Sequence, residues 1–297
     1  MSADEAVQAH LTSPDDLEER AASILPHMVA AAARAAELIA SRAGERGDLE
    51  WRVKGHADFV SDVDMAAERS IRDTLFQLVP DATVMGEELS PQDAPAAGAH
   101  FIVDPLDGTT NFLHGYPEYA VSIALVLDGV LAGGVVQNAA TGERFTASIG
   151  RGAERDGVAI SVSRNDDPAR ALVGTGFPFR NFVQVEAYLR QFEEVSRTTS
   201  GIRRAGSAAL DLCDVACGRF DAFWELELKP WDFAAGVSII REAGGIVTTA
   251  DGSTVPYTPS SIVAGSSAMH PWLLEVVQRR KREKGREVQG DKEKNSP

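Results

Sequence analysis

Asp104-Pro105-Leu106-Asp107-Gly108-Thr109-Thr110-Asn111-Phe112 is the stretch that decides the fold. Three of the four residues before it, at positions 100–103, are apolar, which predicts a strand that ends in the core. No Lys or Arg lies within the stretch, so its two carboxylates have no neighbouring cation. Oxygen ligands of this kind favour Mg²⁺, Mn²⁺ or Ca²⁺ over zinc. Taken alone, the stretch is also compatible with an Asx-type turn that caps a strand.

The small residues Gly108-Thr109-Thr110 come directly after the second carboxylate. Their main-chain N–H groups are available to open a turn or a helix towards an anion. A carboxylate pair that binds a metal beside such N–H groups is typical of a phosphate-ester site.

Composition narrows the classes of protein to which the chain can belong. With 297 residues it can form one large domain or two, and its 44% hydrophobic and 25% charged residues are ordinary for a globular protein. A net charge of −15 argues against a general nucleic-acid binder, because phosphate backbones reward positive fields. Cys213 and Cys217 lie four residues apart in a helix-like stretch, and we interpret them as core thiols of a reducing compartment.

The sequence shows no signal peptide and no membrane span. Residues 1–20 are acidic and lack a basic segment followed by an apolar run. The apolar run at 28–40 is interrupted by Arg34 and Glu37 and is too short to cross a bilayer. We therefore expect a cytoplasmic protein with no membrane partner.

Helical and strand patterns along the chain predict helices and sheets that alternate in layers, without an internal repeat. Helices are expected over residues 25–42, 65–79, 183–198 and 206–217, from 231 to the glycines at 244–245, and from about 271. Strands are expected at 119–127, 130–138, 143–147, 159–162, 171–174, 220–225, 246–249 and 262–264. Asp128-Gly129 is the expected hairpin turn, and Ser61 or Asp62 the expected N-cap that holds Asp64 in the first turn of its helix.

We expect one compact domain over residues 23–278, with subregions at about 23–165 and 166–278. A flexible leader is expected at 1–22. Residues 279–297 carry eight Lys and Arg against four Asp and Glu. Without apolar spacing, this composition predicts a disordered charged tail rather than a nucleic-acid arm.

Acidic residues cluster at the ends of several predicted elements. Strand ends are where open α/β sheets place their sites, so these clusters are expected to converge. Val103 and Trp231, directly before two of the acids, are apolar and predict that the carboxylates leave a buried wall. Buried carboxylates are costly unless a cation binds them. The clusters are Asp58/Asp64, Glu87/Glu88, Asp104/Asp107 and Glu225/Asp232.

The motifs that hold these acids resemble those of the inositol monophosphatase family. The matching segments are Asp58-x-Val60-Ser61-x-x-Asp64, Gly86-Glu87-Glu88, residues 104–112, Trp231-Asp232-x-Ala234-Ala235-Gly236 and Glu242-Ala243-Gly244-Gly245. They come in the family's order, from about residue 25 to residue 277, and the form of 104–112 is specific to the metal-dependent, lithium-sensitive phosphatase superfamily. The resemblance implies an α/β layered sandwich with alternating α-β-α-β-α layers, and a homodimer.

The resemblance also implies two or three Mg²⁺ ions per active site, for which Mn²⁺ could substitute. Glu87, Asp104 and the main-chain carbonyl of Leu106 would hold the first ion. Asp104, Asp107 and Asp232 would hold the second, and Glu87 would share a third. Thr109 and Asp64 would orient the attacking water, so that Thr109, Asp64 and Glu87 are the expected catalytic residues.

The expected substrate contacts divide between the phosphate and the alcohol. By resemblance, the main-chain N–H groups of Gly108 and Thr109 would bind the phosphate, and Asp107 is a further expected substrate contact. Gly206, Ser207, Ala208, Glu225 and Asp232 would contact the hydroxyls of the alcohol.

The implied reaction is Mg²⁺-dependent hydrolysis of inositol 1-phosphate to inositol and phosphate. Thr110-Asn111-Phe112 and Gly176-Phe177-Pro178-Phe179-Arg180 resemble the bacterial inositol monophosphatases. Fructose 1,6-bisphosphate, histidinol phosphate and adenosine bisphosphate stay open as small-molecule substrates. A binding protein on this fold that acts with the transcription machinery also stays open, because a fold does not determine a function.

Other classes of phosphate enzyme fit the sequence less well. Asp62-Val63-Asp64 has the acids of a haloacid-dehalogenase motif, but Ala66 stands where that motif has Thr or Val. A P-loop, G-x-x-x-x-G-K-[ST], is absent, and the six His residues are scattered without a pattern typical of a histidine phosphatase.

Overall fold

The computed structural model describes residues 13–44, 51–55, 58–90, 98–179 and 182–279, with the main chain alone at 51–55 and 58–60. The leader up to residue 12 and the predicted tail from residue 280 lie outside the described residues, as does the side chain of Asp58. Helices and strands are interspersed along the chain, and five strands follow one another between residues 120 and 159.

A seven-stranded sheet occupies the first half of the chain. β3 and β4 are parallel, and every other neighbouring pair is antiparallel. Asp128 and Gly129 both adopt positive φ in the predicted hairpin turn between β5 and β6. The spatial order is β3 (Thr83–Gly86), β4 (Ala99–Asp107), β5 (Ala120–Leu127), β6 (Val130–Asn138), β7 (Arg144–Ser148), β8 (Ala153–Arg155) and β9 (Val158–Ala159).

A five-stranded mixed sheet occupies the second half. β10 is parallel to both of its neighbours, whereas β14 is antiparallel to both of its own. A separate two-stranded sheet pairs β1 (Trp51–Gly55) with β2 (Asp58–Ser61). The order of the five-stranded sheet is β11 (Gly201–Arg203), β10 (Leu172–Thr175), β12 (Ala222–Leu228), β14 (Ser260–Gly265) and β13 (Ile246–Thr248).

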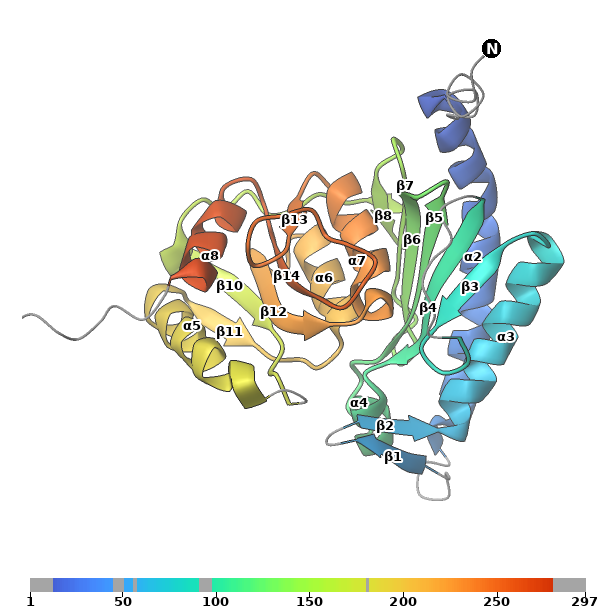
Figure 1. Ribbon diagram of the computed structural model, residues 1–297, viewed down its shortest axis with the longest axis horizontal. Coiled ribbons are helices and arrows are strands. Elements are labelled where there is room, and N and C mark those ends of the chain that lie inside the picture. The colour runs from blue at the N-terminus through green and yellow to red at the C-terminus, as the bar shows by residue number, and fades with distance from the viewer. Residues whose placement is uncertain (1–12, 45–50, 56–57, 91–97, 180–181, 280–297) are drawn as a thin grey trace, which may run out of the picture.

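Helices form three layers around the two sheets (Figure 1). α2 (Pro14–Arg42) and α3 (Asp62–Leu78) cover the outer face of the seven-stranded sheet. α6 (Ala208–Ala216) and α7 (Pro230–Glu242) lie between the sheets, and α5 (Val185–Thr198) and α8 (Met269–Gln278) cover the outer face of the five-stranded sheet. Short helices complete the fold: α4 (Thr109–His114), η3 (Pro168–Arg170) and η4 (Phe182–Gln184). The predicted α-β-α-β-α order is confirmed.

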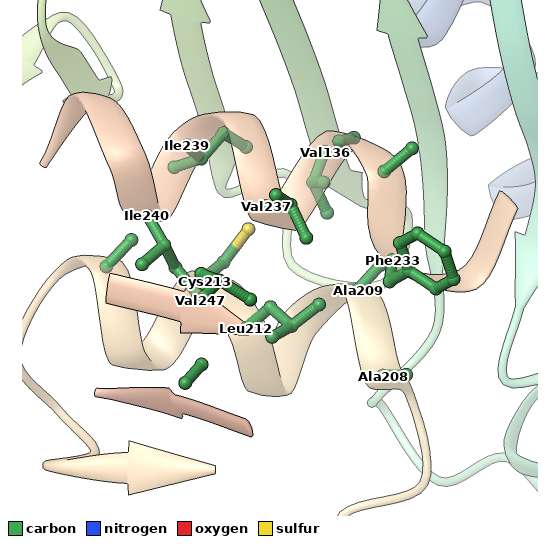
Figure 2. Packing of buried hydrophobic residues seen from close by; sticks show 14 of the residues in the cluster. Val136, Ala208, Ala209, Leu212, Cys213, Phe233, Val237, Ile239, Ile240 and Val247 are labelled. Carbon is green, nitrogen blue, oxygen red and sulfur yellow. The ribbon is translucent and has the colours of Figure 1, made fainter. Parts of the chain in front are cut away.

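Alternating side chains along single strands build separate cores on the two faces of each sheet. In β5, Ile123 and Leu125 pack towards α2 and α3, while Ala124 and Val126 face the central helices. Successive residues of a strand point to opposite faces, so a strand buried on both faces is apolar throughout. Figure 2 shows the central core, where side chains of α6 such as Leu212 meet those of α7.

The first helix begins at Pro14 rather than at residue 25, so residues 14–22 of the predicted leader are helical. Ser13 accepts a hydrogen bond from the Asp16 N–H at 3.1 Å, and Pro14 and two acids occupy the first turn. These are ordinary helix-start signals that the prediction overlooked.

By length and composition alone, α2 passes as a candidate membrane span among the described residues. With 29 residues, this helix is longer than the predicted helix at 25–42 and than the apolar run at 28–40. In the structure α2 packs along α3 and buries Met28, Ala35 and Ile39 in the outer core. Core helices of folded domains satisfy the same length and composition test.

The remaining differences lie at short edge strands. The predicted strand at 159–162 is reduced to β9, because beyond it the Val162 N–H turns to the Ala243 carbonyl at 3.1 Å. β8 and β11, of three residues each, carry no alternating pattern long enough to predict. The other helices and strands that the sequence predicted lie within a few residues of their predicted positions, whereas β2, η3 and η4 were not predicted.

Candidate active site

A cleft of about 380 Å³ opens where the two sheets meet the ends of the central helices. Each of the predicted site residues except Asp64 lines this cleft. They come from the turn after β3, the end of β4 and α4, and from β12, α6 and α7 in the second half of the chain: Glu87, Asp104, Leu106, Asp107, Gly108, Thr109, Gly206, Ser207, Ala208, Glu225 and Asp232.

A β-bulge aligns the two aspartates of β4. Asp104 pairs with Ser122 of β5, and Asp107 pairs with Ala120, so three steps along β4 match two along β5. In a regular strand, residues three apart would point to opposite faces. The extra residue turns Asp107 to the side that Asp104 faces, which places both carboxylates in the cleft.

Asp107 also contacts the second half of the chain. Its Oδ2 accepts hydrogen bonds from Ser207 Oγ at 2.6 Å and from the Ala209 N–H at 2.8 Å. Ser207 is the N-cap of α6. These two hydrogen bonds lower the pKa of Asp107, but desolvation has the larger effect and raises it to about 6.

Asp232 lies in the first turn of α7, where its Oδ2 accepts the Lys229 N–H at 2.7 Å. Desolvation raises the pKa of Asp232 well above its usual range, and the charges of Asp107 and Glu87 raise it further. Desolvation also raises the pKa of Asp104, with the neighbouring acids adding to the effect. The carboxylates of the cleft are therefore desolvated, and their charges repel one another.

The carboxylate oxygen atoms of the cleft are the type of ligand that a hard divalent cation prefers. None of Asp104, Asp107 and Asp232 forms an ion pair within the described residues, and all their free donors are oxygen atoms. In the described part of the chain, no group of three or more His, Cys, Asp and Glu side chains is arranged to hold a metal ion as it stands. Carboxylates that repel one another spread apart, so a bound cation would draw them together.

Asp64 lies behind the cleft and reaches it through Thr109. The Thr109 hydroxyl lies 3.0 Å from Asp64 Oδ1 and 3.1 Å from the Leu106 carbonyl, and its single proton can be donated to either. Ser61 holds the other carboxylate oxygen through its N–H and its hydroxyl, in the predicted N-terminal cap of α3. Burial raises the pKa of Asp64 to about 6.

Gly108 lets the main chain before α4 lie close to the Glu118 carbonyl. Its φ of 89° lies in the left-handed region, and a Cβ there would come within 2.7 Å of the Glu118 carbonyl. The chain can therefore turn from β4 directly into α4, where the Thr109 hydroxyl reaches Asp64.

Besides the predicted Glu225, the cleft is lined by Arg204 and Asp211, two polar residues that the sequence analysis did not single out. The Glu225 carboxylate lies against Gly176, where any Cβ would overlap it. Arg204 stacks on Phe179 with 4.9 Å from its Cζ to the ring centre. Asp211 lines the cleft at 2% exposure, with Oδ1 lacking a hydrogen-bond partner among the described atoms. For Asp211, the available signal was the pair of acids at positions 211 and 214.

Comparison with known proteins identifies the chain. The model of the Inositol monophosphatase family matches residues 20–282, which include every motif of the cleft. The chain belongs to the inositol monophosphatase family.

Relatives within this family have two kinds of name. The chain is 44% identical over 258 residues to the inositol-1-monophosphatase of Rhizobium meliloti, covering 86% of this chain and 97% of the relative. It is also 44% identical over 252 residues to the Nus factor SuhB of Pseudomonas aeruginosa, covering 83% and 93%. Among solved structures, the extragenic suppressor protein suhB of Bartonella henselae superposes with a TM-score of 0.81 at 38% identity, covering 86% and 99%. Members of the family act on small phosphate esters.

Proposed function

We propose that this protein is a Mg²⁺-dependent phosphomonoesterase that hydrolyses inositol 1-phosphate to inositol and phosphate. The observation that carries the proposal is the meeting of Asp104, Asp107 and Asp232 in one desolvated cleft beside the Asp64–Thr109 pair. An inositol-1-monophosphatase is among the relatives at 44% identity, which supports the choice of substrate.

Glu87, Asp104, the Leu106 carbonyl, Asp107 and Asp232 are the proposed ligands of two or three Mg²⁺ ions. Bound Mg²⁺ would neutralise phosphate charge and lower the pKa of water. The protein holds the donors ready from both halves of the chain, because Asp107 is tied to α6 and Asp232 belongs to α7. The main-chain N–H groups of Gly108 and Thr109 are the proposed phosphate contacts.

Asp64 is the proposed proton acceptor, acting through Thr109. The Thr109 hydroxyl can accept a hydrogen bond from the attacking water while donating its own proton to Asp64 Oδ1. With a pKa of about 6, Asp64 is mostly ionised at neutral pH and still basic enough to take a proton. Glu87, which lines the cleft and whose charge acts on Asp64, completes the proposed catalytic set.

Glu225, with Gly206, Ser207 and Ala208, is the proposed wall for the alcohol. Carboxylate oxygens accept hydrogen bonds from hydroxyl groups, which suits a polyol such as inositol. Fructose 1,6-bisphosphate, histidinol phosphate and adenosine bisphosphate are the alternatives that the same cleft has to be tested against.

Phosphate release from a panel of esters tests the proposal. Inositol 1-phosphate, fructose 1,6-bisphosphate, histidinol phosphate and adenosine 3′,5′-bisphosphate are each incubated with Mg²⁺ and, separately, with EDTA. We expect the highest kcat/KM for inositol 1-phosphate and no release in EDTA. A higher kcat/KM for another ester would change the substrate and keep the mechanism, whereas release in EDTA would contradict the role of the metal.

A second candidate function rests on the relatives named Nus factor SuhB, one of which is as similar to this chain as the phosphatase is. In this reading the protein also binds a component of the transcription machinery. Removal of residues 280–297 tests whether the tail contributes, with partner binding lost and hydrolysis unchanged as the expected result. We further propose, from the family resemblance, a cytoplasmic homodimer that lithium inhibits, and light scattering of the purified protein measures the oligomeric state.

A further inference from the structure

Glu68 is a fully buried carboxylate on α3, outside the lining of the cleft. It follows Asp64 by four residues and precedes Arg72 by four. Residues four apart lie on one face of a helix, separated by about 6 Å along the axis. The helix face that ends at the Asp64–Thr109 pair therefore continues through Glu68 and Arg72.

The Glu68 carboxylate binds the turn that follows β3. Its Oε2 accepts the Glu88 N–H at 2.8 Å, and its Oε1 accepts the Leu89 N–H at 3.2 Å. A Cβ on Gly86 would lie 2.1 Å from Glu68 Oε1, so the carboxylate also presses against the end of β3. Glu68 thus touches the main chain on both sides of Glu87.

Arg72 holds the far side of the same turn. It lies 3.8 Å from Glu68 and donates a hydrogen bond to Ser90 Oγ at 2.7 Å. Ser90 in turn pairs with Gly86 through two main-chain hydrogen bonds. The turn at residues 86–90 is therefore closed on itself and fastened to α3 at two points.

Burying a carboxylate to accept the N–H groups of a turn costs free energy, because the carboxylate loses most of its hydration. The advantage is rigidity, since hydrogen bonds to an ionised acceptor are short and strong. Asp64 supplies the corresponding contact to Thr109 from the preceding helical turn. One rigid helix face thus sets both the place of Glu87 and the place of the Asp64–Thr109 pair.

We propose that Glu68 is a positioning residue that fixes the turn presenting Glu87 to the metal site. The inference rests on the proposed function, in which Glu87 is a metal ligand. Groups that orient metal ligands change metal affinity by about 10- to 100-fold when they are replaced.

The test measures Mg²⁺ affinity and stability separately. In Glu68→Gln the side-chain oxygen can serve one of the two N–H groups, while its NH₂ group faces the other. The Mg²⁺ dissociation constant, measured by calorimetry, is expected to rise about 10- to 100-fold. The rate at saturating Mg²⁺ is expected to return to within a few-fold of the unmodified protein, because Glu87 itself is intact.

Asp221→Asn is the matched control. Asp221 is also a buried carboxylate, and it accepts the Leu172 N–H at 2.8 Å and Ser163 Oγ at 2.6 Å, away from the cleft. It is expected to lower the melting temperature without changing Mg²⁺ affinity. An equal loss of Mg²⁺ affinity in both variants would overturn the positioning role.

Two further outcomes separate this inference from the proposed function. If the unmodified protein binds no Mg²⁺, the proposed function and this inference both fail. If it binds Mg²⁺ and Glu68→Gln keeps the dissociation constant within twofold, the inference alone fails. Should Glu68→Gln not fold, Arg72→Met, which removes the Ser90 contact, is expected to weaken Mg²⁺ binding less strongly, and an unchanged constant there would overturn the inference.

Discussion

At the residue scale, Asp104 bears the clearest electrostatic strain in the cleft. It is 1% exposed, its Oδ1 accepts a single main-chain hydrogen bond from the Leu106 N–H, and the charges of Glu87, Asp107 and Asp232 all disfavour its ionised form. The buried charge of Asp104 lowers the stability of the folded protein. Removing that charge should therefore impair function without lowering stability.

Asp104→Asn is predicted to abolish Mg²⁺ binding and hydrolysis without unfolding the protein. The amide has nearly the shape of the carboxylate but carries no charge, so it cannot replace a bridging ligand. Phosphate release is expected to fall by more than about 100-fold, beyond the effect of an orienting group. Circular dichroism and calorimetry check the fold and the binding, and near-normal turnover would refute the metal assignment.

Asp211→Asn is predicted to stabilise the metal-free protein, more so as pH rises. Burial raises the pKa of Asp211 well above 3.8, so the folded state holds a proton that the unfolded state releases. The unmodified protein therefore loses stability as pH rises from about 4 through that raised pKa, and the amide does not. Urea unfolding in EDTA is expected to show little difference at pH 4 and a gain of about 1–3 kcal/mol at pH 7.

The exposed acid Glu154 provides the comparison for that experiment. Glu154→Gln removes a charge at the surface of β8 and is expected to leave stability within about 0.5 kcal/mol at either pH. A gain for Asp211→Asn that does not depend on pH would contradict the explanation by burial.

At the scale of elements, α7 joins the core to the cleft. Its first turn holds Asp232, and its middle lies between β6 and α6. Gly236 permits this packing, because a Cβ there would come within 2.6 Å of Leu212 Cβ on α6. Figure 2 shows how closely the two helices lie around Leu212 and Val237.

Gly236→Ala is predicted to destabilise the protein by about 1–3 kcal/mol, despite the higher helix propensity of Ala. Displacement of α7 should also weaken Mg²⁺ binding, because Asp232 moves with the helix. Urea unfolding and calorimetry measure the two effects. Gly44→Ala, where no atom lies within 4 Å of the added Cβ, is expected to have neither effect, and a similar loss there would refute the packing argument.

At the scale of the whole molecule, the cleft depends on both halves of the chain. The seven-stranded sheet supplies Asp104 and Asp107, and α7 supplies Asp232. A cation bound by all three would join the two halves in the folded state and not in the unfolded chain. Binding should therefore be visible in the stability of the entire domain.

Mg²⁺ is predicted to raise the melting temperature by several degrees. At 100 times the dissociation constant, a ligand that binds the folded state contributes about 2.7 kcal/mol. Calorimetric scans with Mg²⁺ and with EDTA measure the shift, and Asp104→Asn should lose it. Equal melting temperatures of the unmodified protein in both solutions would contradict a metal site shared between the halves.

Local sequence was enough to place most elements, and the family resemblance of the motifs named most of the acids that line the cleft. The turn residues, the amphipathic helix after Ser61 and the bend at 104–112 act over a few positions, and the structure has them in place. Misplaced boundaries were those where a signal was present but overlooked, at Ser13-Pro14, or where a strand was too short to show a period.

What the sequence by itself determined is therefore the family, the layered fold and the acids that face one another. The tertiary structure alone decided how those acids are held. The bulge that aligns Asp107 with Asp104 depends on pairing with β5, and the burial of Glu68 depends on a turn that lies eighteen or more residues further along the chain. Such contacts join residues far apart in the sequence, and local periodicity carries no information about which distant main-chain groups a buried carboxylate will meet.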